Sequence, residues 1–381
     1  MRLASSRVRV AVAVTSLALV LAAGPASGSS TLDAGRDSDG VTATVQAADK
    51  AWGWGDNASG RVGDGTQTNH LSPVKVIDLK RVDELSAGVY HSLALRKNGI
   101  VKAWGSNSWG QLGDGTQTAQ WSPVRVIDLE GVTDVDAGES HSLAVLSDGT
   151  IRGWGANQWG QLGDGMVRPA SSLTTTLLDS VSEVSAGSYH SLGLRADGTV
   201  WAWGRNDYGE LGDGTTTDRL IPVQVIGLSD VLAVSAGAYT SAALTADGTV
   251  WEWGTISHGS AVESKTPAVH TPVQVAGLSG ITMIDVNGSP LALTADGIVW
   301  TWGEVTAPMA GLDGLTIVYV DASGHVVTSE GAVWGWGYNA QGQVGDGTTI
   351  TRDNPVLITG LPAVSAVDSS NYHGLAGPTL S

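Results

Sequence analysis

The sequence predicts an all-β fold, namely a seven-bladed β-propeller that is closed by pairing of its N- and C-terminal strands. Three observations lead to this prediction: a Trp-Gly pair that recurs seven times, a second landmark that keeps step with it, and strand and turn patterns that repeat within each unit. Repeats of about 50 residues with four short strands each are typical of propeller blades, because stacked blades bury both faces of every sheet.

The Trp-Gly pairs define seven units. They begin at Trp54, Trp104, Trp154, Trp203, Trp253, Trp302 and Trp336, so the spacing is 49 or 50 residues except for the last one of 34. The second landmark reads "SAGVYHSLAL" at residues 86–95 and returns six more times, with weaker copies toward the C-terminus. Because the two landmarks stay in step, we expect one blade per unit.

Each unit consists of strands and turns. "YHSLAL" and "VWAWG" both alternate, and an Asp-Gly turn such as Asp197-Gly198 joins them, which predicts a β-hairpin. A glycine-rich loop follows, as in "WGSNSWGQLGDGT" (104–116), and the next short strand is expected from the proline of "PVKVIDL" (73–79) onward. One asparagine of the loop is expected to cap the turn with its side chain, namely Asn107, Asn157, Asn206 and Asn339.

The phase of the repeat predicts that the ring closes. The chain enters the repeats with a Trp-Gly strand, "DKAWGWG" (49–55), that lacks the preceding strand of its hairpin. It ends with "NYHGLAGPTLS" (371–381), a hairpin strand that lacks its Trp-Gly mate. Pairing the two would complete the seventh blade and remove the exposed sheet edges of an open array.

The N-terminal segment has the order of features found in secretory signal peptides. Residues 1–28 carry arginines at 2, 7 and 9, an apolar run from Val10 to Ala23, and then small residues. A transmembrane anchor fits less well, because a spanning helix needs roughly 20 apolar residues. We therefore expect a secreted protein with a signal peptide (1–28), a flexible polar lead (29–46) and a propeller of seven repeats (47–381).

Charge and composition exclude several classes of partner. The chain has 20 basic and 37 acidic residues, and removal of residues 1–28 leaves 17 basic residues and a net charge of −20. Such a surface repels phosphate backbones, so we expect no nucleic acid partner. The chain has no cysteine, so packing alone must hold the fold. We expect no membrane association after signal cleavage, and a monomer.

The repeated polar residues are interpreted as structural. His91, His141 and His190 each precede a serine, which suggests a hydrolase, but adjacent residues of a strand point to opposite faces. These histidines and His373 are interpreted as fixing blade geometry through a backbone hydrogen bond. The aspartates of the Gly-Asp-Gly turns are interpreted as turn-stabilising rather than calcium-binding, because each loop offers a single carboxylate. We expect no enzymatic activity, catalytic residue, metal or cofactor.

At these landmarks the sequence resembles the regulator of chromosome condensation repeat family, whose units read similarly to "AGxxHSLAL…DGxVWxWGxNxxGQLGxG". The likeness runs from about residue 48 to 376, is strong in units one to four and thins in units five and six. It implies a seven-bladed propeller. Nuclear members act as guanine nucleotide exchange factors and dock on chromatin, which the signal peptide and the charge argue against. Secreted bacterial members include propeller-type β-lactamase inhibitory proteins, which unit six resembles.

Aromatic residues at two variable slots point to one face of the disc. Since the Asp-Gly turns mark one end of each hairpin, the residues before the histidine slot and those after Trp-Gly lie at the other end. These slots carry Tyr90, Tyr189, Tyr239 and Tyr372, and Trp109, Trp159 and Tyr208. Exposed Trp and Tyr are typical anchors of protein interfaces. The sequence therefore suggests a non-enzymatic propeller that binds an unidentified protein, such as a secreted enzyme that it inhibits or regulates.

Several alternatives stay open at this stage. The aromatic rings could pack under the glycine loops, bind cell-surface carbohydrate by stacking, or play no role in a structural envelope protein. Guanine nucleotide exchange is the least favoured. The departures from the repeat at residues 166–180 and 255–270 mark either a specific contact or neutral drift.

Overall fold

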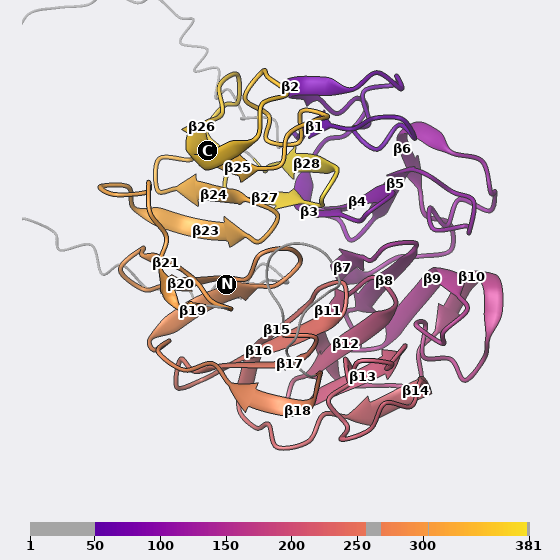
Figure 1. Cartoon of the computed structure of the whole chain (residues 1–381). Helices are drawn as coiled ribbons and strands as arrows, with labels where there is room; N and C mark the ends of the chain where they lie inside the picture. The colour runs from indigo at the N-terminus through magenta and orange to yellow at the C-terminus, as the bar shows by residue number, and fades with distance from the viewer. Residues whose placement is uncertain (1–49, 257–267, 304, 379–381) are drawn as a thin grey trace, which may run out of the picture.

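The computed structural model describes residues 50–256, 268–303 and 305–378, which form a ring of seven four-stranded sheets (Figure 1). The predicted seven-bladed propeller is therefore confirmed. We number the blades 1 to 7 after the Trp-Gly unit that each contains. Within the described residues no helix is long and apolar enough to cross a membrane. The expected signal peptide (1–28) and polar lead (29–46) lie outside the described residues.

Each blade runs from an innermost strand to an outer edge strand, and neighbouring strands are antiparallel. The innermost strands of blades 1 to 7 are β27 (Val367–Ser369), β3 (Val82–Ala87), β7 (Val132–Ala137), β11 (Val181–Ala186), β15 (Val231–Ala236), β19 (Ile281–Asp285) and β23 (Ile317–Asp321). The second strands are β28 (His373–Ala376), β4 (His91–Arg96), β8 (His141–Leu146), β12 (His190–Arg195), β16 (Thr240–Thr245), β20 (Leu291–Thr294) and β24 (His325–Thr328).

The third and fourth strands complete the blades. The third strands, which carry Trp-Gly in most blades, are β1 (Trp52–Gly55), β5 (Val101–Gly105), β9 (Ile151–Asn157), β13 (Val200–Gly204), β17 (Val250–Gly254), β21 (Val299–Thr301) and β25 (Val333–Gly337). The outer strands are β2 (His70–Lys75), β6 (Gln120–Arg125), β10 (Arg168–Thr175), β14 (Arg219–Gln224), β18 (Val269–Gln274), β22 (Ala307–Pro308) and β26 (Arg352–Leu357).

The two ends of the chain close the ring in blade 1. Strand β1 pairs with β28 from Trp52 opposite Ala376 to Gly55 opposite His373, so the strand order is β2-β1-β28-β27. Figure 1 shows β1 beside β28 and β27 although they lie at opposite ends of the sequence. The predicted closure is confirmed, and the innermost strands of blades 7, 1 and 2 contact one another around the axis.

The predicted hairpin is confirmed, whereas the outer strand differs from its prediction. β12 pairs with β13, and the turn at Gly198 donates its N–H to the carbonyl of Arg195 at 3.0 Å. The outer strand β2 begins at His70, before Pro73, rather than at the proline. An edge strand tolerates a proline inside it because one side of the strand has no ladder to complete. The irregular units still form complete blades, although β22 has only two residues.

A closed ring of hydrogen bonds joins the innermost strands around the central axis. In every blade one serine or aspartate side chain accepts the backbone N–H of the next blade, for example Ser86 from Ala137 at 3.0 Å and Asp136 from Ala186 at 2.9 Å. These bonds are buried and span 2.8–3.2 Å. The seven acceptors are Asp368, Ser86, Asp136, Ser185, Ser235, Asp285 and Asp321.

Candidate functional site

One asparagine side chain forms hydrogen bonds across each glycine loop. The side-chain oxygen of Asn107 accepts the N–H of Leu112 at 3.0 Å, and its amide donates to Asp114 at 3.0 Å. The same arrangement recurs at Asn57, Asn157, Asn206 and Asn339. The predicted asparagine caps are therefore confirmed.

The aspartates of the Gly-Asp-Gly turns are engaged in the same loops. Asp213 accepts hydrogen bonds from the N–H and hydroxyl of Thr215 and from Arg219 of the outer strand. These contacts agree with a role in stabilising the turn. Among the residues that the structure describes, no group of three or more His, Asp or Glu side chains is placed to hold a metal ion.

The next blade holds each glycine loop in place through hydrogen bonds to a loop carbonyl. The indole N–H of Trp154 and the hydroxyl of Ser142, both in blade 3, donate to the carbonyl of Gln111 in the loop of blade 2 at 2.8 and 2.9 Å. His91 bonds to the same serine at 2.8 Å through Nε2. Since the serine hydrogen goes to the carbonyl, His91 must donate. The histidines thus fix blade geometry, but through the serine of the next blade instead of a backbone group.

The repeated histidines are neutral in the folded protein. Burial lowers the pKa of His91, His141 and His190 to about 3 and that of His325 to about 4. No histidine is bonded to the serine that follows it in the sequence; instead His91, His141 and His190 bond to Ser142, Ser191 and Ser241. The Ser-His pairs that suggested a hydrolase are therefore links between blades.

Four of the seven predicted site residues gather around one arginine. The guanidinium carbon of Arg205 lies 5.2–5.7 Å from the ring centroids of Trp159, Tyr189, Tyr208 and Tyr239. The rings of Tyr208 and Tyr239 are 5.2 Å apart, and Arg205 is paired with Asp207 at 2.7 Å. We call Arg205 and the four rings around it the Arg205 cluster. They come from blades 3, 4 and 5, and all four rings are partly exposed.

Two groups have raised pKa values here: Tyr189 belongs to the Arg205 cluster, and Glu210 lies beside it. The Tyr189 hydroxyl donates to Glu139 at 2.7 Å, and burial together with this bond raises the pKa of Tyr189. Glu210 lies under Tyr208 and accepts its backbone N–H at 2.8 Å. Burial raises the pKa of Glu210 to about 7. The cluster therefore combines aromatic faces with a paired cation, and a buried carboxyl group with a raised pKa lies beside it.

Two further predicted residues form a second, smaller group. Tyr90 and Tyr372 stack with ring centroids 6.3 Å apart, and Arg61 lies 5.8 and 5.3 Å from them. Arg61 itself is buried, and it donates to the carbonyl of Val89 at 3.1 Å. We call these three residues the Arg61 cluster. Both tyrosines are 36% exposed, so their rings are accessible from the same face as the glycine loops.

Trp109 stands apart from both clusters. It is 36% exposed and lines a cleft of about 800 Å³ between the loop of blade 2 and the outer part of blade 3. Opposite it lie Arg152 and Leu173, the latter in the eight-residue strand β10. The departure from the repeat at residues 166–180 thus supplies one wall of a cleft. The predicted arc of Trp109, Trp159 and Tyr208 is divided between two sites.

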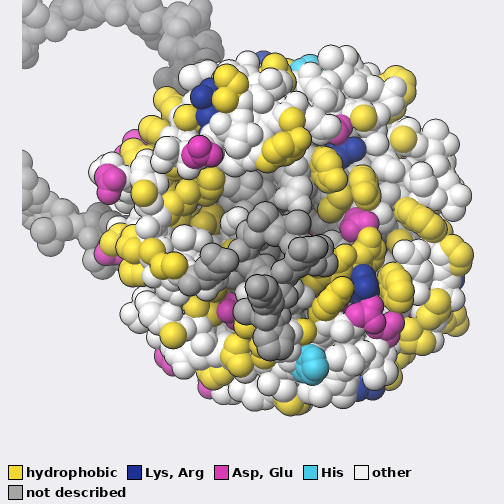
Figure 2. Space-filling view, viewed as in Figure 1, with side chains coloured by type: hydrophobic (Ala, Val, Ile, Leu, Met, Phe, Trp, Pro, Cys, Tyr) yellow, Lys and Arg dark blue, Asp and Glu magenta, His cyan; other side chains and the backbone are white. Residues whose placement is uncertain are grey.

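Reasoning from the sequence missed the two arginines of the clusters, and it also passed over Tyr338, an exposed ring that belongs to neither cluster. Arg205 and Tyr338 occupy the slot directly after Trp-Gly, and Tyr338 is 67% exposed. That slot varies from unit to unit, which was the signal that could have found them. Arg61 replaces the glutamine of "GQLGDG" in the first loop. Figure 2 shows that hydrophobic side chains gather around the centre of the face in view, with basic and acidic side chains between them.

Comparisons with known proteins agree with the fold. The model of the protein family described as RCC1-like domain matches residues 37–317, and the one described as Regulator of chromosome condensation (RCC1) repeat matches residues 330–376. No curated protein matches the chain.

Several solved structures share the architecture. Human WBSCR16 is 21% identical to this chain with a TM-score of 0.78, and the match covers 87% of this chain and 99% of the WBSCR16 chain. Prp20p of Saccharomyces cerevisiae, described with its binding to Gsp1p and histones, is 20% identical with a TM-score of 0.76, covering 89% and 93%. Yeast RCC1 (Prp20) in its structure with Kap60 is 19% identical with a TM-score of 0.76, covering 95% and 97%. At these identities the likeness shows the fold alone.

Proposed function

Because this chain belongs to the RCC1-like domain family, whose model matches residues 37–317, we propose that it is an exported, non-enzymatic propeller that binds a protein partner through its aromatic face. In this proposal the partner is itself an exported protein, for example an enzyme that the propeller inhibits or regulates. The order of features in residues 1–28 and the acidic charge support export and argue against a nuclear role.

The Arg205 cluster is the observation that carries this proposal. Trp, Tyr and Arg are the residue types that dominate the binding energy of protein interfaces. Here four partly exposed rings surround one guanidinium, and each is held by contacts with its neighbours. A preordered patch loses little side-chain entropy on binding, so more of its contact energy becomes affinity. The Arg61 cluster extends the same face by two stacked tyrosines.

The solved relatives give this proposal further support. Prp20p is described with its binding to Gsp1p and histones, and Kap60 is bound to yeast RCC1 (Prp20) in a crystal structure. Propellers of this fold therefore include proteins whose partners are other proteins. Because a shared fold does not fix function, the site itself has to identify the partner of this chain.

Capture from culture supernatant and cell envelope, followed by mass spectrometry, tests the proposal. We expect wild-type protein to retain one enriched protein that Trp159→Ala loses and Trp109→Ala keeps. These two tryptophans occupy the same slot of adjacent units, but only Trp159 belongs to the Arg205 cluster. A captured protein that binds the wild type and both variants equally, or the absence of any enriched protein, would contradict the proposal.

A second candidate function, carbohydrate binding, is favoured by the cleft beside Trp109. The cleft of about 800 Å³ combines an exposed indole with Gln117, Asp128 and Arg152, and such groups can stack on and hydrogen-bond a sugar. A glycan array with wild-type protein and Trp109→Ala separates the two functions. Polysaccharide binding that is lost in Trp109→Ala and kept in Trp159→Ala would support this candidate, and an array without any bound glycan would remove it.

A further inference from the structure

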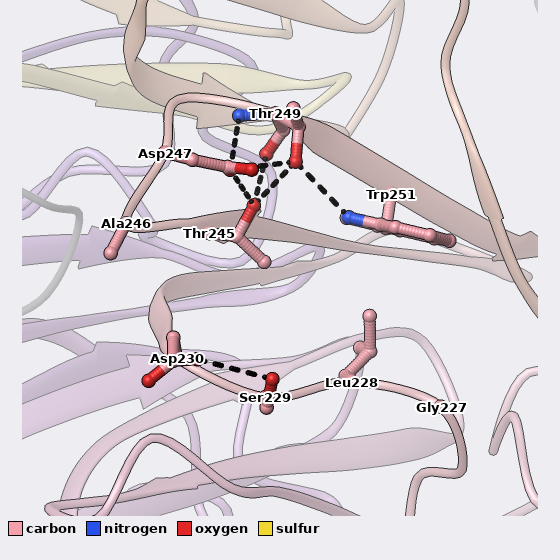
Figure 3. Close-up of a pocket in the computed structure, with 9 residues that line it drawn as sticks. All are labelled: Gly227, Leu228, Ser229, Asp230, Thr245, Ala246, Asp247, Thr249 and Trp251. Atoms are coloured by element: carbon pink, nitrogen blue, oxygen red, sulfur yellow. Dashed lines mark hydrogen bonds between the residues drawn. The ribbon is translucent and has the colours of Figure 1, made fainter.

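A cavity of about 320 Å³ opens in blade 5, at the end of the blade opposite the glycine loops. The Asp-Gly turn after β16 forms one wall with Thr245, Asp247, Thr249 and Trp251, and residues 227–230 before β15 form the other (Figure 3). Figure 3 shows Trp251 and Asp247 on one side and Ser229 and Asp230 on the other. This place is distinct from both aromatic clusters, which lie at the other end of the blades.

Blade 4 carries nearly the same hairpin, and there the corresponding place is filled. The two hairpins read Ala-Asp-Gly-Thr-Val-Trp at 196–201 and 246–251. In both, the threonine hydroxyl donates to the aspartate and the indole N–H donates to the threonine, at 3.3 Å from Trp201 and 3.2 Å from Trp251. The residue before the hairpin differs, because blade 4 has Arg195 and blade 5 has Thr245.

Arg195 shows what kind of group fits over this tryptophan. Its guanidinium carbon lies 4.8 Å from the ring centroid of Trp201. Its Nε donates to the carbonyl of Asp179 at 3.0 Å, and its Nη2 donates to the carboxylate of the same residue at 2.8 Å. A cation over an indole face is attracted by the negative face of the ring. In blade 4 the face of Trp201 is thus covered by Arg195 of the same blade.

Blade 5 presents the same partners without the arginine. The residue equivalent to Asp179 is Ser229, and an acidic group follows it as Asp230, so a carbonyl and a carboxylate again border the place. Asp247 adds a second carboxylate, and hydrogen bonds from Thr245 and Thr249 lower the pKa of Asp247. In blades 6 and 7 a Thr-Trp pair recurs, but Ile298 and Ala332 replace Thr249, so the hydroxyl between carboxylate and indole is missing.

We propose that the cavity in blade 5 binds the guanidinium group of an arginine side chain from a partner protein, stacked on Trp251 and paired with Asp230 and Asp247. The net charge of −17 favours the approach of a basic group. The site is independent of the proposed aromatic interface, so either can fail without the other. A cation–π contact with surface ion pairs implies a Kd on the order of tens of millimolar for an isolated arginine, which a larger partner would improve.

Titration of ¹⁵N-tryptophan-labelled protein with N-acetylarginine amide tests this site. We expect a saturable shift of the Trp251 indole signal, which Trp251→Phe assigns, and binding of the neutral, equally shaped N-acetylcitrulline amide that is at least about fivefold weaker. Asp230→Asn should weaken binding about twofold to fivefold, and asparagine tolerates the positive φ of 53° at this position. An equal response to both compounds, or no saturable shift, would overturn the proposal.

Exchange of the two blades' residues provides the matched variants. Thr245→Arg should abolish the response, because the new side chain fills the cavity as Arg195 does in blade 4, whereas Thr245→Ser should keep it. Conversely, Arg195→Thr should uncover Trp201 and make its indole signal respond as well. The Arg195→Thr variant still tests the proposed site if Thr245→Arg does not fold. A Trp201 signal that stays unchanged in folded Arg195→Thr protein would contradict the assignment.

Discussion

Glu210 occupies a position at which other loops carry glutamine, namely Gln111, Gln161 and Gln343. All four side chains accept a backbone N–H from two residues earlier, at 2.8–3.0 Å. The glutamate is 1% exposed, and burial raises its pKa to about 7 from the 4.5 of a free glutamate. The unfolded chain therefore releases the Glu210 proton at a lower pH than the folded protein does.

Glu210→Gln should stabilise the protein at high pH only. Because the folded pKa is raised, the wild type loses stability as pH rises from 4.5 to about 7, by roughly 3 kcal/mol in total. The amide carries no such dependence, so the free energy of unfolding should rise by about that amount at pH 8 and change little at pH 4.5. Urea denaturation at the two pH values measures this. A gain of equal size at both would show that Glu210 is not the titrating group.

Single residues whose partners lie in the same loop could be understood from the sequence, and those whose partners lie on other blades could not. The asparagine caps were predictable because the same residue recurs at the same distance from the Gly-Asp-Gly turn. The hydrogen-bond partners of His91, His141 and His190 were not, because each partner lies on the next blade, 50 or 51 residues away. Arg205 was missed for the same reason, since its aromatic partners come from three blades.

Among the structural elements, the glycine loops depend most on close approach between blades. A Cβ atom at Gly163 would lie 2.9 Å from the ring of Trp203 and 2.8 Å from Thr176. Gly227 has a similar positive φ, 78° against 67°, but nothing lies within 4 Å of its Cβ position. Comparing Gly163 with Gly227 therefore distinguishes the conformational cost of a side chain at positive φ from the cost of a steric clash.

Gly227→Ala should therefore cost about 1 kcal/mol, whereas Gly163→Ala should cost about 2–4 kcal/mol. The additional loss comes from pushing the Trp203 indole away from the loop carbonyl that it bonds, that of Gln161 at 2.8 Å. Chemical denaturation of both variants at one pH measures the difference. Equal losses would mean that the loop does not pack tightly against the next blade.

At the scale of elements, the hairpins were predictable and the edges of the blades were not. Alternation and Asp-Gly turns are local signals, so β12 and β13 fall where the sequence places them. The innermost strand, such as "VDELSA" of β3, was not located, because polar side chains such as Ser86 serve the ring of hydrogen bonds at the axis. The outer strand begins before its proline, since an edge strand has no further neighbour to bond.

For the molecule as a whole, the closed ring makes all seven blades depend on one another. The phase of the repeat was enough to predict the closure in blade 1, because a strand without a partner stands at each end of the repeats. The division of the aromatic face into two clusters and a cleft was not predictable, because it depends on the spacing between side chains of different blades.

Acid should unfold the protein cooperatively through the five histidines that are buried in the described part of the chain, His91, His141, His190, His325 and His373. Burial depresses their folded pKa values, so they favour the folded state above pH 6.5, and this contribution is lost as pH falls toward 3. Near pH 5 each of the five histidines binds about one proton on unfolding, whereas Glu210 releases up to one. Unfolding should therefore take up roughly four to five protons in total. The slope of the unfolding free energy against pH measures this number. A flat slope between pH 6.5 and 5 would contradict the neutral, buried state of the histidines.

The most direct test of the proposed function is the affinity of the captured partner for variants of the Arg205 cluster. We expect Tyr239→Ala, which removes a ring that contacts both Tyr208 and Arg205, to raise the Kd by about 30-fold or more, as an interface hot spot does. Tyr338→Ala, an exposed tyrosine outside both clusters, should leave the Kd within about twofold in the same titration. Calorimetric titration of both variants against wild type gives the answer. Equal affinities for wild type and Tyr239→Ala in folded protein would show that the aromatic face is not where the partner binds.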